Sequence, residues 1–250
     1  MDWAHALPTL TASFLASVVE GVEALTVVLA VGATRGWRPA LVGTGLGVAG
    51  LALVVLALGP ALTRIPIRDL QVVVGFLLLL FGMRWLRKAI LRSAGVIALH
   101  DEAAVYSGKS AQLQGVARVT DPKWDAVAIS TAFEIVMLEG MEVVFIVIAV
   151  GAAGGTLVPA SIGAAAALLL VVLLGASVRA PLARIPENAL KFAVGVLLSG
   201  FGTFWLGEGI GVDWPGDDLA LLVLVAWFFG VALLAVRFCR LRRTVSVSAG

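Results

Sequence analysis

The sequence is poor in the residues that build most redox and enzymatic centres. Among 250 residues it has one cysteine, Cys239, and two histidines, His5 and His100. A single cysteine excludes a disulfide framework, an iron–sulfur cluster and a thiolate zinc site. Both histidines lie outside the apolar segments, which argues against a bis-histidine haem inside a membrane. We therefore expect no permanently bound cofactor and no enzymatic activity.

Charge is also scarce. Charged residues make up 14% of the chain and hydrophobic residues 60%, whereas about a quarter of a soluble domain is charged. A transmembrane helix needs about 20 mostly apolar residues. Seven segments are predicted to span the membrane: Leu10–Gly32, Pro39–Leu62, Leu70–Leu86, Trp124–Val150, Val158–Val178, Leu190–Leu206 and Leu219–Val236. The prediction is an all-α polytopic protein whose surroundings are the lipid bilayer and not nucleic acid.

The basic residues indicate the orientation of these spans. If the N-terminus lies outside, 16 of the 18 lysines and arginines fall on the inner side, and only Arg64 and Arg68 fall outside. Positive charge accumulates on the cytoplasmic side of membrane proteins. We therefore predict a multi-pass protein of the plasma (inner) membrane, with the N-terminus outside and the C-terminus in the cytoplasm.

An internal repeat divides the chain. Residues Glu20–Gly32 match Glu139–Gly151 at seven of 13 positions, and Leu62–Leu86 match Leu182–Leu206 at 13 of 25. Each copy contains three predicted spans, and an odd number places the second copy upside down. Inverted repeats are common in secondary transporters, whose sites lie near the midplane between the repeats. They also occur in channels and in some membrane enzymes.

The repeat defines four regions. They are a first three-helix repeat (1–91), a cytoplasmic connector (92–123) with a short amphipathic helix around His100–Leu113, a second, inverted three-helix repeat (124–211), and a seventh transmembrane helix with a basic cytoplasmic tail (212–250).

Two pairs of glutamates lie inside the predicted spans. Glu20 and Glu23 are roughly 16–20 Å along the first span, and Glu139 and Glu142 lie at the equivalent depth of the fourth. An acidic residue at the centre of a membrane helix costs roughly 2.5–3.5 kcal/mol, so such residues are functional candidates. Residues three apart share a helix face. We expect the four carboxylates to converge, with no lysine or arginine at that depth, so that a metal cation or protons must neutralise them.

Carboxylate oxygens suit hard cations such as Mg²⁺, Ca²⁺, Mn²⁺ and iron. Glu134, two helical turns before Glu142, is a further candidate for the ion path, whereas Glu208 is favoured as a solvated charge at a helix end. Hydroxyl ligands could come from Ser13, Ser17, Thr26, Ser130 and Thr131, although serine and threonine more often serve helix packing.

Two Glu-Gly-x-Glu motifs, in the first and fourth of seven helices, resemble those of the high-affinity iron permeases of the iron/lead transporter family. That family carries Arg-Glu-Gly-Leu-Glu in both helices; this sequence has Val19 and Leu138 in place of the arginine. The resemblance implies that Glu20, Glu23, Glu139 and Glu142 bind and pass the metal, most simply iron. It also raises an iron-delivery protein or oxidase outside the membrane as a partner, and a homo-oligomer is left open.

Three alternatives remain at this stage. One is a manganese or calcium/proton exchanger of the same architecture. Another is a non-transport membrane subunit, either an enzyme or an electron-transfer protein. The third is a proton-conducting or assembly subunit that carries no metal.

Overall fold

The computed structural model describes residues 3–62, 65–116, 124–153, 155–177, 186–216 and 219–248. The described residues form eight α-helices and no strand, as the all-α prediction requires. The helices are α1 (Trp3–Arg35), α2 (Trp37–Leu62), α3 (Ile67–Ser93), α4 (Glu102–Gly115), α5 (Ala126–Ala153), α6 (Leu157–Ser177), α7 (Glu187–Gly209) and α8 (Leu219–Ser248).

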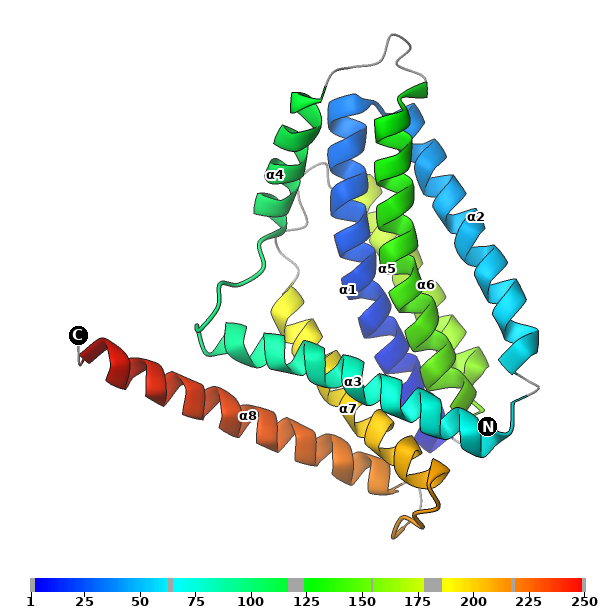
Figure 1. Cartoon of the computed structure of the whole chain (residues 1–250), viewed down its shortest axis with the longest axis vertical. Helices are drawn as coiled ribbons and strands as arrows, with labels where there is room; N and C mark the ends of the chain where they lie inside the picture. The colour runs from blue at the N-terminus through cyan, green and yellow to red at the C-terminus, as the bar shows by residue number, and fades with distance from the viewer. Residues whose placement is uncertain are drawn as a thin grey trace.

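The helices form two groups with different directions. In Figure 1, α1, α2 and α5 run along the long axis of the molecule with α6 behind them, whereas α3 and α8 cross the lower part at a steep angle. The short helix α4 stands beside α1 and packs against it. The lower part is held together by α7, which packs on α3, α8 and α1.

Six described helices are long and apolar enough to cross a membrane, namely α1, α2, α3, α6, α7 and α8. The remaining long helix, α5, has 28 residues but carries Glu134, Glu139 and Glu142. The connector contains the expected short helix, α4, which begins at Glu102 after its N-cap Asp101. The chain is therefore an integral, multi-pass membrane protein by the length and composition of its helices.

The third helices of the two sequence repeats cross at very short range. A Cβ atom on Gly75 of α3 would lie 2.5 Å from the backbone nitrogen of Leu206 on α7. A Cβ atom on Gly195 of α7 would lie 2.8 Å from the backbone nitrogen of Leu86 on α3. Gly75 and Gly195 are equivalent in the repeat, as are Leu86 and Leu206. Only glycine allows such an approach, which is typical of packing between membrane helices.

The second helix of each repeat packs closely on the first helix of the other repeat. A Cβ atom on Gly43 of α2 would lie 2.2 Å from the carbonyl oxygen of Ile129 on α5, and one on Gly163 of α6 would lie 2.4 Å from that of Leu10 on α1. These four residues are again two equivalent pairs. Exchanging the repeats leaves these contacts unchanged, so each half completes the packing of the other.

One buried cation ties the connector to this framework. Arg35, at the end of α1, donates to Asp125 at 2.6 Å and to the carbonyl oxygens of Leu113 and Val116 at 3.0 and 2.6 Å. The Asp125 side chain also accepts hydrogen bonds from the backbone at the start of α5. The contact therefore joins the ends of α1 and α4 to the beginning of α5.

Replacing Asp125 with asparagine should destabilise the protein strongly. The side chains of Arg35 and Asp125 are 1% and 5% exposed, and breaking a buried pair costs about 3–5 kcal/mol because one charge is left uncompensated. Thermal unfolding in detergent, followed by tryptophan fluorescence, measures the loss. Asp101→Asn is the matched control, since Asp101 caps α4 from an exposed position. Equal melting temperatures for the two variants would contradict the assigned role of Arg35.

Candidate metal-ion site

Three glutamates from two helices meet inside the helical framework. Glu20 and Glu23 of α1 and Glu139 of α5 each offer a carboxylate oxygen, and these oxygens lie within 4.8 Å of one another. Glu20 is 2% exposed, whereas Glu23 and Glu139 are half-buried. We call these three residues the Glu20 group. Its carboxylate oxygens are the ligands that hard cations prefer, and they are close enough together for one ion to contact all three.

The spacing of each motif explains how the group forms. Glu20 and Glu23 are three residues apart on α1, so both side chains leave one face of the helix. The glycines inside the motifs allow neighbouring helices to approach. A Cβ on Gly21 would lie 3.2 Å from Val171 of α6, and one on Gly140 would lie 2.1 Å from Leu51 of α2. The two glutamate motifs are thus each held by the second helix of the other repeat.

Several polar atoms of α1 are buried and have no hydrogen-bond partner among the residues that the structure describes. They are Glu20 Oε1, Ser17 Oγ and Thr26 Oγ1. Burying a polar group without a partner costs free energy, so an ion or water normally satisfies such atoms. Ser13 differs, because its hydroxyl donates to the carbonyl oxygen of Ala160 at 2.6 Å and so serves packing. Ser17 therefore fits an expected hydroxyl ligand better than Ser13 does, whereas the Thr26 hydroxyl lies beside Glu102 of α4.

The expectation that no basic residue reaches the depth of the glutamates is wrong. Lys191 of α7 is 8% exposed and forms an ion pair with Glu23; its Nζ also lies 3.2 Å from Glu187 Oε1. The sequence placed Lys191 at the inner surface because it begins a predicted span. In the structure the start of α7 lies against the middle of α1, so position along one helix does not give the depth relative to another.

The other predicted acidic residues are not among the three oxygens that meet in the Glu20 group. Glu142 of α5 is half-buried and does not join the three oxygens, and Glu134 is exposed on the same helix. Glu208, at the end of α7, accepts a hydrogen bond of 2.8 Å from Gln71 of α3. The carboxylates of α1 and α5 are therefore not arranged equally, although their motifs are equivalent in sequence.

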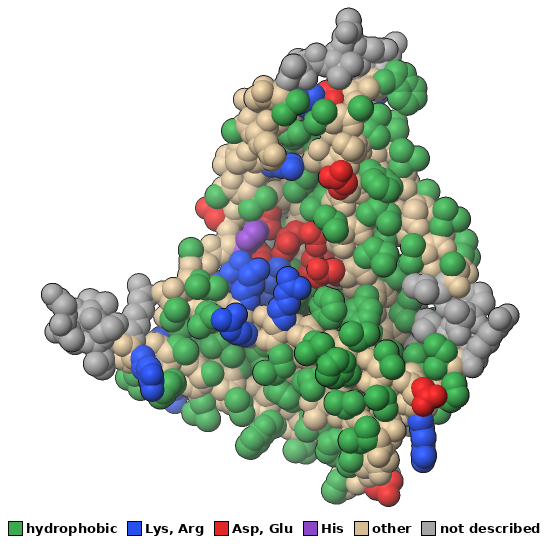
Figure 2. Space-filling view, viewed as in Figure 1, with side chains coloured by type: hydrophobic (Ala, Val, Ile, Leu, Met, Phe, Trp, Pro, Cys, Tyr) green, Lys and Arg blue, Asp and Glu red, His purple; other side chains and the backbone are tan. Residues whose placement is uncertain are grey.

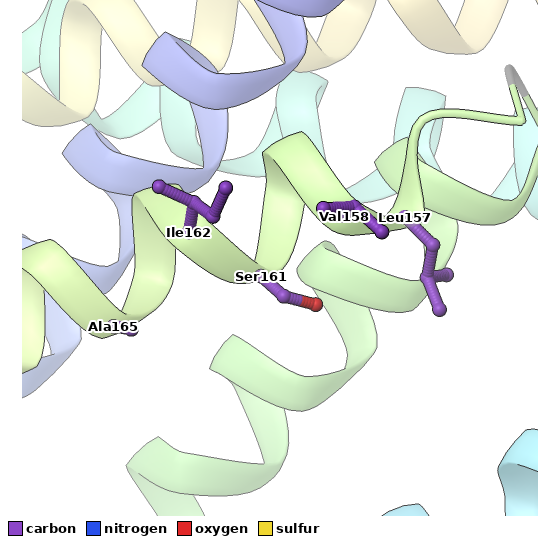
Figure 3. A pocket seen from close by; sticks show the side chains of 5 residues that line it. All are labelled: Leu157, Val158, Ser161, Ile162 and Ala165. Carbon is purple, nitrogen blue, oxygen red and sulfur yellow. The ribbon is translucent and has the colours of Figure 1, made fainter.

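One face of the molecule carries a cluster of charged side chains within a mostly apolar surface. Figure 2 shows acidic and basic side chains with one histidine gathered in a hollow near the centre of the view, amid a mostly hydrophobic surface. An open pocket of about 350 Å³ on α6 is lined by Leu157, Val158, Ser161, Ile162 and Ala165 (Figure 3). Its one polar side chain offers no ligand set, and its exposed apolar residues are those expected to face lipid.

Comparison with known families identifies one that this chain matches. A sequence model of the family described as "ferrous iron uptake permease, iron-lead transporter" matches residues 110–237, slightly more than half of the chain. The match includes α5, α6 and α7, and hence Glu139, Glu142 and Lys191, but not Glu20 or Glu23. Searches of curated proteins and of solved structures gave no match.

Proposed function

Because the chain belongs to the family of ferrous iron uptake permeases and iron-lead transporters, we propose that it moves Fe²⁺ across the membrane through the Glu20 group. The observation that carries the proposal is the meeting of three carboxylates from both sequence repeats within 4.8 Å. Carboxylate oxygens bind divalent cations, and intramembrane carboxylates that face one another mark ion pathways.

The charges in the group favour a divalent cation. The three carboxylates of the Glu20 group carry three negative charges when ionised, and the ammonium group of Lys191, paired with Glu23, carries one positive charge. One Fe²⁺ ion neutralises the remainder, whereas Fe³⁺ would leave an excess of positive charge in a low-dielectric interior. Val19 and Leu138 at the arginine positions of the motif agree with a site that needs no further cation beside Lys191.

We also propose that the two repeats are inverted halves of a seven-span protein, in which α5 is the fourth span and the N-terminus lies outside. The reciprocal glycine contacts of α3 with α7, and of α1 and α2 with α6 and α5, support this arrangement. The Glu20 group then lies at the interface of the halves, where inverted-repeat transporters bind their substrates. Glu142 and Glu134 extend the path along α5.

A manganese or calcium/proton exchanger is the second candidate, because the Glu20 group offers only oxygen ligands, which Mn²⁺ and Ca²⁺ accept as readily as iron does. The uptake experiment described next distinguishes iron transport from manganese or calcium exchange.

Uptake by proteoliposomes tests the proposal. Purified protein is reconstituted into vesicles that contain a dye quenched by iron, and Fe²⁺ is added without oxygen; parallel vesicles report Mn²⁺ and Ca²⁺. We expect Fe²⁺ uptake well above that of protein-free vesicles. Uptake of Mn²⁺ or Ca²⁺ without Fe²⁺ would select the exchanger, and no flux of any of the three ions would refute a transport function.

A further inference from the structure

A second cluster of ligand-type side chains lies between the connector and α7. His100 and Glu102 flank the N-cap of α4, and Glu187 is the first residue of α7. His100 Nε2 lies 3.2 Å from Glu102 Oε1 and 3.5 Å from Glu187 Oε2. One ligand atom from each residue lies within 4.8 Å of the other two. We call these three residues the His100 group.

Three of the four carboxylate oxygens of the His100 group are buried without a hydrogen-bond partner among the described residues. The side chains of Glu102 and Glu187 are 5% and 6% exposed. Within the described part of the chain the three oxygens are both oxygens of Glu102 and Oε2 of Glu187. His100 Nε2 is close to two of them, and the Thr26 hydroxyl lies beside the Glu102 carboxylate. A buried carboxylate with neither oxygen hydrogen-bonded is costly, and a bound ion removes that cost.

The other oxygen of Glu187 is already held in place. Glu187 Oε1 accepts a hydrogen bond of 3.2 Å from Arg92 Nη1 and lies 3.2 Å from Lys191 Nζ. These two contacts leave Oε2 directed toward His100 and Glu102. Outer contacts that orient a ligand in this way are typical of metal sites.

The distances and donor types fit a transition-metal ion. Neighbouring ligands around an octahedral ion with bonds of about 2.1 Å are about 3 Å apart, close to the separations of 3.2 and 3.5 Å around His100 Nε2. One imidazole and two carboxylates suit Fe²⁺ or Mn²⁺ better than Ca²⁺, which binds through oxygens.

We propose that His100, Glu102 and Glu187 form a second divalent-cation site, which receives the ion from the Glu20 group on the connector side. This role rests on the proposed function, although the binding itself does not. Lys191 links the sites, because its ammonium group contacts Glu23 of the first and Glu187 of the second. None of the three ligands has an equivalent in the first repeat: Glu187 corresponds to Ile67, and the other two lie in the connector. The second site therefore has no counterpart related to it by the sequence repeat, and it lies only on the connector side of the Glu20 group.

Manganese binding tests the second site without any transport measurement. The full chain is purified in detergent with an affinity tag free of histidine and loaded with Mn²⁺, and electron spin echo envelope modulation detects nitrogen bound to the metal. We expect a ¹⁴N coupling in the wild type that changes to ¹⁵N when the protein is labelled with ¹⁵N-histidine. Labelling needs no substitution, so misfolding cannot explain the result. The absence of a histidine coupling would overturn the proposal in favour of a protonated His100 paired with the glutamates.

Variants then assign the nitrogen and the stoichiometry. His100→Gln should abolish the coupling and His5→Gln should keep it, since these are the chain's two histidines. The wild type should bind two Mn²⁺ ions per chain; Glu102→Gln and Glu139→Gln should each bind one, with the coupling kept only in Glu139→Gln. A coupling that survives in His100→Gln would refute the site. If the protein transports iron in vesicles but shows no histidine coupling to Mn²⁺, the second site alone is refuted. If it shows the histidine coupling but transports no iron, the transport function alone is refuted.

Discussion

Replacing Glu20 with glutamine is expected to lower Fe²⁺ flux in proteoliposomes by at least about 100-fold, because even residues that merely orient metal ligands typically change metal affinity by 10–100-fold. Glutamine keeps the size of the side chain and removes its charge. Glu20 is the most buried member of the Glu20 group, and its Oε1 has no partner within the described residues. The remaining two carboxylates and Lys191 would then carry one net negative charge, too little to neutralise a divalent ion.

Glu139→Gln should give a loss of similar size, because Glu139 is the contribution of α5 to the same group. Asp69→Asn is the matched control, since Asp69 is an exposed carboxylate in the first turn of α3, and it should keep the wild-type flux. The comparison is informative because the family match covers Glu139 but not Glu20. Wild-type flux in Glu20→Gln beside a loss in Glu139→Gln would confine the ion path to the second repeat.

The glutamates could be predicted from the sequence because the features that mark them lie within single contiguous segments. A charged residue inside an apolar span is conspicuous, and the distance between Glu20 and Glu23 along one helix follows from helix geometry. The same holds for the spans themselves, since their length and hydropathy are properties of contiguous segments. The short helix of the connector was also expected, and Asp101 before it is a favourable N-cap.

The residues that the sequence did not predict are those whose positions depend on how distant helices are staggered. Glu187 and Lys191 begin α7, and nothing in their own segment places them beside the middle of α1. His100 lies outside the predicted spans, where the sequence predicts no ligand, yet α4 packs along α1 and brings it near α7. A signal was present in the repeat, because Lys191 and Glu187 are charged where the first copy has Gln71 and Ile67.

These differences break the symmetry of the site. Glu23 and Glu142 are equivalent in sequence, but Glu23 pairs with Lys191 and joins the Glu20 group, whereas Glu142 does neither among the described contacts. Gln71, the counterpart of Lys191, instead donates to Glu208. A site between two equivalent halves has no preferred side. Here the lysine is present in the second repeat alone. Its charge competes with the metal for Glu23, and this asymmetry gives the ion path a direction.

Replacing Lys191 with methionine is therefore expected to lower both KM for Fe²⁺ and the maximal rate. Without the ammonium group, the Glu20 group carries three negative charges and holds the ion more tightly, so release becomes slow. Two unit charges 4 Å apart interact with about 4 kcal/mol at an effective dielectric constant of 20. Even a third of that energy would reduce KM about tenfold. Initial rates of Fe²⁺ uptake over a range of concentrations measure both quantities.

A second substitution distinguishes this charge effect from simple damage to the fold. The double variant Lys191→Met/Glu23→Gln has two carboxylates and no lysine in the group, and so regains the wild-type net charge of minus two. It should recover a KM close to that of the wild type. Lys88→Met, at an exposed position of α3, should change neither parameter. A different result would show that Lys191 only supports packing. In that case KM would rise in Lys191→Met and would not return to the wild-type value in the double variant. A lost structural contact weakens binding, and removing a further charge cannot reverse that loss.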